Sequence, residues 1–407
     1  MENISYGQWI QDKLEELANQ TKTDGQIWRP SYSDHDRKGH ELLRTWITDA
    51  GLEWREDVIG NVYGRLSGVS TETILIGSHI DTVKNGGKYD GAAGVITGLA
   101  VLKFLKEQGV RPQYTLEVVG LVEEEGSRFA ASCQGSCAIC GTLSEQELME
   151  KDVDGITFLD AAHAAGYAPE RMEQAKRDDI RAYLELHIEQ GPLLEQSGNI
   201  IGVVENIVGI ATYDITIHGE QNHAGTTVMS LRKDPVVAAA RLISSLTDEI
   251  SARSPSATVT FGRVDTDPGM PNVIAGRAHL LLDMREKDEE MLREHEALLM
   301  ELVQKIQSNG MQTEAVRTQW TRPVAMDPRL VQRVHEAAEV EGYPFIHMNS
   351  GAGHDAMVFG KKVPTAMIFV PSCKGISHNP LEYTSTEDLN AGFRVLCRTV
   401  VTLANPE

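Results

Sequence analysis

The chain has 407 residues, of which 41% are hydrophobic and 24% charged, close to the composition of ordinary globular proteins. This length exceeds what one ordinary hydrophobic core supports, and it favours about two domains. The 38 basic and 59 acidic residues give a formal net charge of -21, which repels nucleic acids and anionic membrane surfaces and argues against either as a partner.

The first 20 residues have the apolar spacing of an amphipathic helix and lack the pattern of a signal peptide. No apolar run in the sequence approaches the roughly 20 residues that a membrane-spanning helix needs. We therefore expect a cytoplasmic protein.

Strand and helix patterns then alternate. TILIGSH (73–79), YTLEVVGLV (114–122) and YLELHI (183–188) are short apolar runs typical of buried strands, and GVITGLAVLKFLKEQG (94–109) has helical spacing. After Pro323 the alternation resumes, and it predicts a helix, a strand and a closing helix at 327–342, 364–370 and 386–404. Together these segments predict an α/β domain formed by residues 1–209 and 323–407.

Between them the pattern changes. The segment from Gly209 to about Thr321 predicts a strand, a helix, two strands, a second helix and a final strand, the first five at 211–219, 234–250, 257–264, 273–285 and 288–307. This order is that of a ferredoxin-like α+β domain and is complete in itself. We therefore predict that residues 210–322 form a second domain inserted into the first.

The five cysteines are an odd number in a long chain, which is poor support for a disulfide framework. Cys133, Cys137 and Cys140 have a CxxxCxxC spacing that iron–sulfur clusters can use. The surrounding segment is rich in alanine and compatible with a helix. We therefore favour small, half-buried cysteines over a cluster.

Four polar motifs follow predicted strands. They are GSHIDTVKNGGKYDGAAG (77–94), EEEGSRF (123–129), HIEQG (187–191) and GISHNP (375–380). Open α/β sheets bind ligands outside the carboxyl ends of their strands, so we expect the motifs to meet at one edge. Each motif alone is weak, because a lone histidine is usually structural and acidic runs are usually solvated turns. Together their imidazoles and carboxylates suit zinc, manganese or cobalt.

The order of the motifs resembles the co-catalytic dimetal amidases and peptidases, which include aminoacylases, carboxypeptidase-type enzymes, allantoate amidohydrolases and N-carbamoyl-L-amino acid hydrolases. The resemblance spans nearly the whole chain. It implies two divalent ions per subunit, zinc or manganese with cobalt possible. His79 and His187 would each head the shell of one ion and Asp90 would bridge the two. The full set of implied ligands is His79, Asp90, Glu125, His187 and His378.

The resemblance also implies catalytic roles for two carboxylates. Glu124 would be the general base, taking a proton from a water polarised by the ions and passing it to the leaving nitrogen. Asp81 would accept a hydrogen bond from the far nitrogen of His79 and fix its tautomer. Placing the Glu-Glu pair immediately before Gly126 leaves Glu123 without a role at the site.

HIEQGPLLE, NHAGTT, MPNVIAGRAHLLLDMR and SGAGHDAMVF narrow the resemblance to the amidase branch that acts on carbamoyl and ureido groups. The inserted domain would be a lid and the dimer surface, so that His223 would serve the site of the partner subunit. Arg285 would grip a substrate carboxylate, although a surface arginine on a strand remains the alternative. The implied substrate contacts are Gln190, His223, Asn272, Arg285, Ser350, Gly351 and Ala352.

The motifs SGAGHD, EEGSRF and VPSCKGISHNP look closer to allantoate amidohydrolases than to carbamoylases. This implies hydrolysis of one ureido group of allantoate to ureidoglycine, ammonia and carbon dioxide, a step of ureide and purine catabolism. The first alternative is an N-carbamoyl-L-amino acid hydrolase of the L-carbamoylase or β-ureidopropionase type. A dipeptidase or aminoacylase of the same fold is more remote, as are a metal-free binding protein and an iron–sulfur enzyme.

Overall fold

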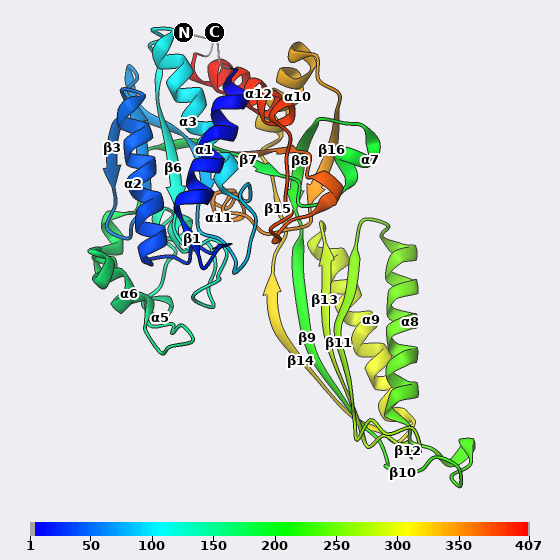
Figure 1. Cartoon of the computed structure of the whole chain (residues 1–407). Helices are drawn as coiled ribbons and strands as arrows, with labels where there is room; N and C mark the ends of the chain where they lie inside the picture. The colour runs from blue at the N-terminus through cyan, green and yellow to red at the C-terminus, as the bar shows by residue number, and fades with distance from the viewer. Residues whose placement is uncertain (1–4, 406–407) are drawn as a thin grey trace. The chain divides into compact units, whose positions relative to one another are not determined.

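The computed structural model describes residues 5–405 and divides the chain into two compact units (Figure 1). The first unit runs to Glu205 and resumes at Ala325, and the second comprises Asn206–Val324. The second unit therefore begins and ends a few residues outside the segment 210–322 that the sequence predicts.

Four parallel strands form the centre of a nine-stranded sheet in the first unit. In spatial order they are β17 (Thr365–Val370), β7 (Ile180–Ile188), β5 (Ser70–His79) and β6 (Tyr114–Leu121). Each of these runs is almost wholly buried, as expected for a sheet covered on both faces. The three strands predicted before residue 190 and the strand predicted at 364–370 are these four.

Antiparallel strands extend the sheet on both sides. On one side β4 (Val62–Leu66) pairs with β6, and β3 (Glu53–Glu56) pairs with β4. On the other side β8 (Ile201–Ile207) pairs with β17. Beyond β8 lie β15 (Val324–Ala325) and β16 (Phe345–Ser350).

Long helices share one hydrophobic core with this sheet. α3 (Ala92–Glu107) contacts β5, β6 and β7, and α10 (Pro328–Glu341) and α12 (Thr386–Ala404) contact β17. α1 (Tyr6–Gln20) packs on α3 and α12, and α2 (Asp34–Asp49) packs on β3 and β4. α1 begins one residue after Ser5, whose hydroxyl accepts the amide hydrogen of Gln8.

A smaller core around Phe129 and Phe158 lies under a series of short helices. Cys133, Cys137 and Cys140 lie on or beside α4, and none of the five cysteines forms a disulfide. Within residues 5–405, no helix has the length and apolarity required to cross a membrane, and the cytoplasmic location stays a prediction. The short elements are β1 (Lys22–Thr23), β2 (Gln26–Ile27), α4 (Gln134–Ile139), α5 (Glu145–Leu148), α6 (Phe158–Ala165), α7 (Leu193–Ser197) and α11 (Ala356–Phe359), together with 3-10 turns at Pro169–Gln174, Met229–Leu231 and Cys373–Gly375.

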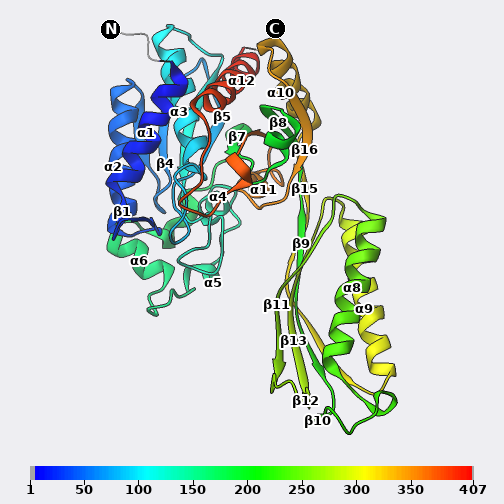
Figure 2. The ribbon, with the colours of Figure 1, turned by 45° about the vertical axis from the view of Figure 1, so that its right-hand side comes forward.

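The second unit has the predicted order of strand, helix, strand, strand, helix, strand. Two helices pack on one face of an antiparallel four-stranded sheet whose order is β11-β13-β9-β14 (Figure 2). Strand β9 alternates strictly between buried and half-buried residues, as a sheet with one covered face requires. The elements are β9 (Gly209–His218), α8 (Pro235–Arg253), β11 (Thr258–Asp267), β13 (Arg277–Glu286), α9 (Glu289–Ser308) and β14 (Gln312–Thr321).

The prediction of one continuous strand over 273–285 is wrong. The chain instead forms β12 (Val273–Ile274), which pairs with β10 (Asn222–His223), and then β13, which pairs with β9 and β11. Ala275 and the bend at Gly276 separate the two ladders. Apolar residues on both sides of the bend made the two short strands look like one.

Candidate metal centre

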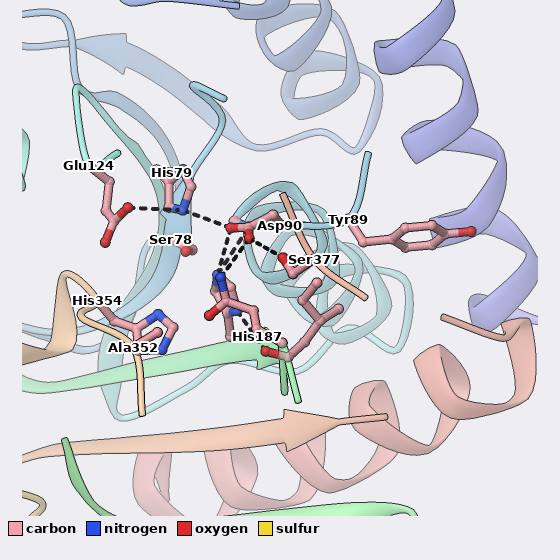
Figure 3. Close-up of polar contacts among 12 residues, drawn as sticks. Ser78, His79, Tyr89, Asp90, Glu124, His187, Ala352, His354 and Ser377 are labelled. Carbon is pink, nitrogen blue, oxygen red and sulfur yellow. Dashed lines mark hydrogen bonds and ion pairs between the residues drawn. The ribbon is translucent and has the colours of Figure 1, made fainter. Parts of the chain in front are cut away.

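The carboxyl ends of four neighbouring parallel strands bring the candidate ligands together, and Figure 3 shows His79, Asp90 and His187 of this group. His79 ends β5, and His187 is the penultimate residue of β7. Glu124 and Glu125 follow β6, and His378 follows β17. Adjacent parallel strands end at the same edge of the sheet. Residues that are far apart in the sequence therefore lie together in one site.

The Asp90 carboxylate lies at the centre of these side chains. Its Oδ1 lies 3.5 Å from His79 Nε2 and 3.2 Å from His187 Nε2, and its Oδ2 lies 3.4 Å from His378 Nε2. The two oxygens therefore face different imidazoles, which is the arrangement that a carboxylate shared by two ions requires. Two groups of ligand atoms close enough to hold a metal ion share this residue, namely His79–Asp90–His187 and Asp90–Glu125–His378.

This grouping differs from the implied one, in which His79 and His187 head different shells. Because β5 and β7 are neighbours in the sheet, the two imidazoles lie beside each other, with ring centroids 6.0 Å apart. The other group forms between loops, since Glu125 Oε2 lies 3.3 Å from His378 Nε2. The donor types, two imidazoles with one carboxylate and one imidazole with two carboxylates, suit zinc or manganese.

Three further side chains hold Asp90 in place. Gln190 Nε2 and the Ser377 hydroxyl donate to Asp90 Oδ2 over 2.7 and 2.9 Å. The buried Glu382 accepts the backbone amide hydrogens of Tyr89 and Asp90, and its Oε2 lies 2.9 Å from the Ser377 hydroxyl oxygen. Sequence reasoning missed Ser377 and Glu382. Ser377 adjoins His378, which was a usable signal, but nothing local distinguishes Glu382.

Gly91 allows the close approach of Asp90 to His79. It precedes α3 with φ +59°, and a Cβ there would lie 2.4 Å from His79 Nε2. Any side chain at this position would therefore strain the backbone and displace the imidazole.

The three carboxylates after β6 point in different directions. Glu123 is fully buried and accepts the amide hydrogens of Arg128 and Phe129, so it holds the loop together. Glu125 faces His378, whereas Glu124 Oε2 lies 3.5 Å from His79 Nε2 and Glu124 belongs to neither ligand group found among the described residues. A carboxylate beside two ligand groups but outside both has the placement of a general base.

Asp81 approaches the far nitrogen of His79, as the sequence implied. Its backbone carbonyl lies 3.1 Å and its carboxylate 3.5 Å from His79 Nδ1. The carboxylate oxygens also accept the backbone amide hydrogens of Glu124 and Glu125 over 3.2 and 3.1 Å. Asp81 therefore joins the loop after β5 to the loop after β6.

Burial and crowding of charge perturb the titration of this cluster. Burial opposes ionisation of Asp90, but the charge of His187 and hydrogen bonds from the imidazoles hold the pKa of Asp90 well below its usual range. Burial and the charge of Asp90 raise the pKa of Glu125 to about 7, and burial raises the pKa of Glu124. The hydrogen bond to Asp90 raises the pKa of His378 to about 9. Such opposed shifts are typical of functional sites.

The SGAGHD motif forms the loop after β16. The buried Ser350 hydroxyl contacts the carbonyl and amide of Ala352 and lies 2.9 Å from His354 Nε2. The buried His354 ring packs 4.5 Å from the ring of His187, and burial together with the charge of His187 holds the pKa of His354 well below its usual range. Gly351 lies within the same loop. The sequence analysis quoted this motif but gave His354 no role.

Comparison with known proteins places the chain in a family. Residues 75–402 match the model of Peptidase family M20/M25/M40. The chain belongs to this family. It is 40% identical over 408 residues to allantoate amidohydrolase of Bacillus subtilis, covering 99% of both chains. It is 38% identical over 410 residues to N-carbamoyl-L-amino acid amidohydrolase of Geobacillus stearothermophilus, covering 98% of this chain and 99% of that one.

A crystal structure of an amidase of the hydantoinase/carbamoylase family from Burkholderia multivorans matches with a TM-score of 0.91 and 36% identity, covering 98% of each chain. These matches confirm the resemblance stated from the motifs. They also confirm the prediction of a hydrolase that acts on linear amide or ureido C–N bonds.

Within this family member, the implied substrate contacts of the second unit lie in two places. The His223 Nδ1 accepts the amide hydrogens of Gly225 and Thr226, so its Nε2 carries the proton, and the Asn272 carbonyl accepts the amide hydrogen of Ala224. These residues adjoin the Arg277 end of β13, whereas Arg285 lies at the other end and pairs with Asp283 on its own strand. The stretch from residue 277 to residue 285 spans about 26 Å at roughly 3.3 Å per residue.

Proposed function

We propose that this protein is a metal-dependent amidohydrolase that hydrolyses one ureido group of allantoate and releases ammonia and carbon dioxide, leaving ureidoglycine. The observation that carries the proposal is the Asp90 carboxylate, whose two oxygens face two separate ligand groups beside the outlying Glu124. The similarity to an allantoate amidohydrolase over the full chain supports this substrate. The nearly equal similarity to an N-carbamoyl-L-amino acid amidohydrolase makes that activity the second candidate.

Two divalent ions would be held through Asp90, one by His79 and His187 and the other by Glu125 and His378, with zinc or manganese matching the donor set. Bound ions supply Lewis acidity that lowers the pKa of a nucleophilic water. Glu124 then takes the proton of that water and delivers it to the leaving nitrogen. Asp81 accepts the backbone amide hydrogens of Glu124 and Glu125. These two hydrogen bonds hold the general base and the metal ligand in fixed positions relative to each other.

We further propose that the second unit is a ferredoxin-like lid and the dimerisation surface. Arg285 lies at one end of β13, and His223 and Asn272 adjoin the other end. This separation is too large for the three side chains of one chain to contact the same small substrate. A homodimer resolves this, because His223 and Asn272 of one subunit would serve the site of the other. Arg285 would exchange its contact with Asp283 for the substrate carboxylate, a bidentate pairing that its guanidinium fits.

The test is ammonia release by protein that has been stripped with a chelator and reloaded with manganese. Allantoate and an N-carbamoyl-L-amino acid are offered side by side, and preference for allantoate by at least about tenfold in kcat/KM, about 1.4 kcal/mol of transition-state discrimination, is expected. The opposite preference would leave the metal mechanism in place but replace the substrate. Metal-independent release, or no release from either compound, would overturn the proposal.

A further inference from the structure

A second cluster of histidines and carboxylates lies on the first unit and shares no residue with the Asp90 centre. His335 on α10 and His347 on β16 face each other, with His335 Nδ1 2.9 Å from His347 Nε2. His347 Nδ1 lies 2.8 Å from Glu205 Oε1 on β8, and His335 Nε2 lies 3.6 Å from Glu339 Oε1. The four side chains form a line of carboxylate, imidazole, imidazole and carboxylate.

The facing nitrogens are close to the separation that a shared cation needs. Two bonds of about 2.05 Å at a tetrahedral ion place their nitrogens roughly 3.3 Å apart, so the two nitrogens would separate by about 0.4 Å and each ring would turn to direct its lone pair at the ion. One of these nitrogens must carry a proton when no cation binds, and a cation would replace that proton.

The outer nitrogens are already oriented as in metal sites. A ligating histidine usually donates its other ring nitrogen to a carboxylate, which fixes the tautomer and raises the basicity of the ligating nitrogen. Glu205 accepts in that position from His347, and Glu339 Oε1 lies 3.6 Å from His335 Nε2, just beyond hydrogen-bond range. The edge of Phe345 packs on His335 with ring centroids 4.7 Å apart and limits its rotation.

The cluster is accessible and electrostatically suited to a cation. The side chains of His335 and His347 are 27% and 35% exposed, and Glu205 and Glu339 are more exposed still. The nearby Glu336 is paired with Arg333, which leaves two carboxylates flanking the two imidazoles. The open coordination positions can be filled by water.

We propose that His335 and His347 bind a borderline divalent cation such as Zn²⁺, Cu²⁺ or Ni²⁺, the ions that imidazole ligands favour. Because His335 is on a helix and His347 on an edge strand whose neighbour carries Glu205, the ion ties α10 to the edge of the large sheet. This site is independent of the proposed function, since none of its residues contributes to the Asp90 centre.

The experiment counts ions in the purified full-length protein. Wild type, His335→Gln and His347→Gln are dialysed against micromolar Zn²⁺, and zinc per chain is measured by elemental analysis. His163→Gln is the matched control, because His163 is an exposed histidine paired with a single carboxylate, Glu170, at 2.8 Å. Wild type and His163→Gln should bind one more zinc per chain than either of the other variants, and zinc should raise the Tm of these two proteins further than that of the His335→Gln and His347→Gln proteins.

A further variant guards against a folding defect in the histidine variants. Glu205→Gln keeps both imidazoles and should weaken zinc binding at this site by roughly 10- to 100-fold. Cu²⁺ added to wild type should give an absorption band of nitrogen-ligated copper that is weaker in His347→Gln by the contribution of one site, because the Asp90 centre is intact in both proteins. Equal zinc content in all variants, or a copper band of equal intensity in wild type and both histidine variants, would overturn the proposal.

Discussion

The Asp90 carboxylate owes its orientation to residues distant in the sequence. Gln190 and Ser377 donate to its Oδ2, and Glu382 lies beside the Ser377 hydroxyl and fixes the backbone amides of Tyr89 and Asp90. A shared carboxylate must present its two oxygens to two places at once. A loss of this orientation therefore affects both ligand groups together.

Glu382→Gln should lower the affinity for both ions by roughly 10- to 100-fold while leaving the fold intact. The amide keeps the size of the side chain and an oxygen for the two backbone amides, but it replaces the Oε2 that faces the Ser377 hydroxyl with an NH₂ group and removes the negative charge. Chelator competition measures the affinity, and Glu387→Gln on the exposed first turn of α12 is the control. Unchanged metal affinity in Glu382→Gln would show that Gln190 and Ser377 are sufficient to orient the Asp90 carboxylate.

Glu124→Gln separates catalysis from metal binding. Glu124 lies outside both ligand groups, so metal content should stay at the wild-type level while kcat falls by about 10²- to 10⁴-fold, the usual contribution of a general base. Elemental analysis and ammonia release on the same preparation measure the two effects. Asp90→Asn, in contrast, should lose the ions themselves. Retained activity in Glu124→Gln would remove its role as the base.

The candidate ligands could be selected from the sequence because each of them lies at or after the end of a strand, within a recognisable motif. Glu382, Ser377 and His354 were missed because their roles depend on contacts across the fold. The Glu382 contact to Asp90 joins residues 292 positions apart, which no local pattern encodes. The grouping of His79 with His187 differs from the implied one for a related reason, since it depends on β5 and β7 being neighbours in the sheet.

At the scale of elements, the residue before α3, Gly91, has a positive φ and also lies against the candidate ligand His79. Gly91→Ala places a methyl group against the His79 ring and also forces alanine into a left-handed conformation. We expect a loss of metal together with a lower Tm. Gly342→Ala is the matched control, because Gly342 has φ +76° at the end of α10 and no atom within 4 Å of the added Cβ.

The control should lose about 1 kcal/mol of unfolding free energy from backbone strain and keep its metal. Metal analysis and thermal unfolding of both variants distinguish strain from steric displacement. A Gly91→Ala protein that binds metal normally would mean that the loop moves aside and that His79 is not confined by this glycine.

A strand can be predicted from the local sequence where its residues are uniformly buried or strictly alternate between buried and exposed. The continuous apolar runs of β5, β6, β7 and β17 and the alternation of β9 were therefore predictable. The division into β12 and β13 was not, because it depends on which partner strand each part finds. Strand order in the large sheet is likewise a product of tertiary packing and could not be read from the sequence.

At the scale of the whole molecule, the separation of Arg285 from His223 and Asn272 bears on whether the active site is formed by one chain or by two. If one substrate is bound by all three residues, two chains must contribute to each site. This claim can be tested by complementation between two inactive variants, Glu124→Gln and His223→Ala. Each variant alone should have little activity, whichever chain supplies His223.

The mixture of the two variants distinguishes the alternatives. If His223 acts in the site of the partner, each heterodimer contains one site with both Glu124 and His223 intact. Random reassociation makes about half of the dimers mixed, so the mixture should recover about a quarter of wild-type activity. If His223 acts within its own chain, every site lacks one group and nothing is recovered. If the activity of the mixture does not exceed the summed activities of the two separate variants, the shared site is refuted. The proposed role of the second unit in the dimer is then refuted as well.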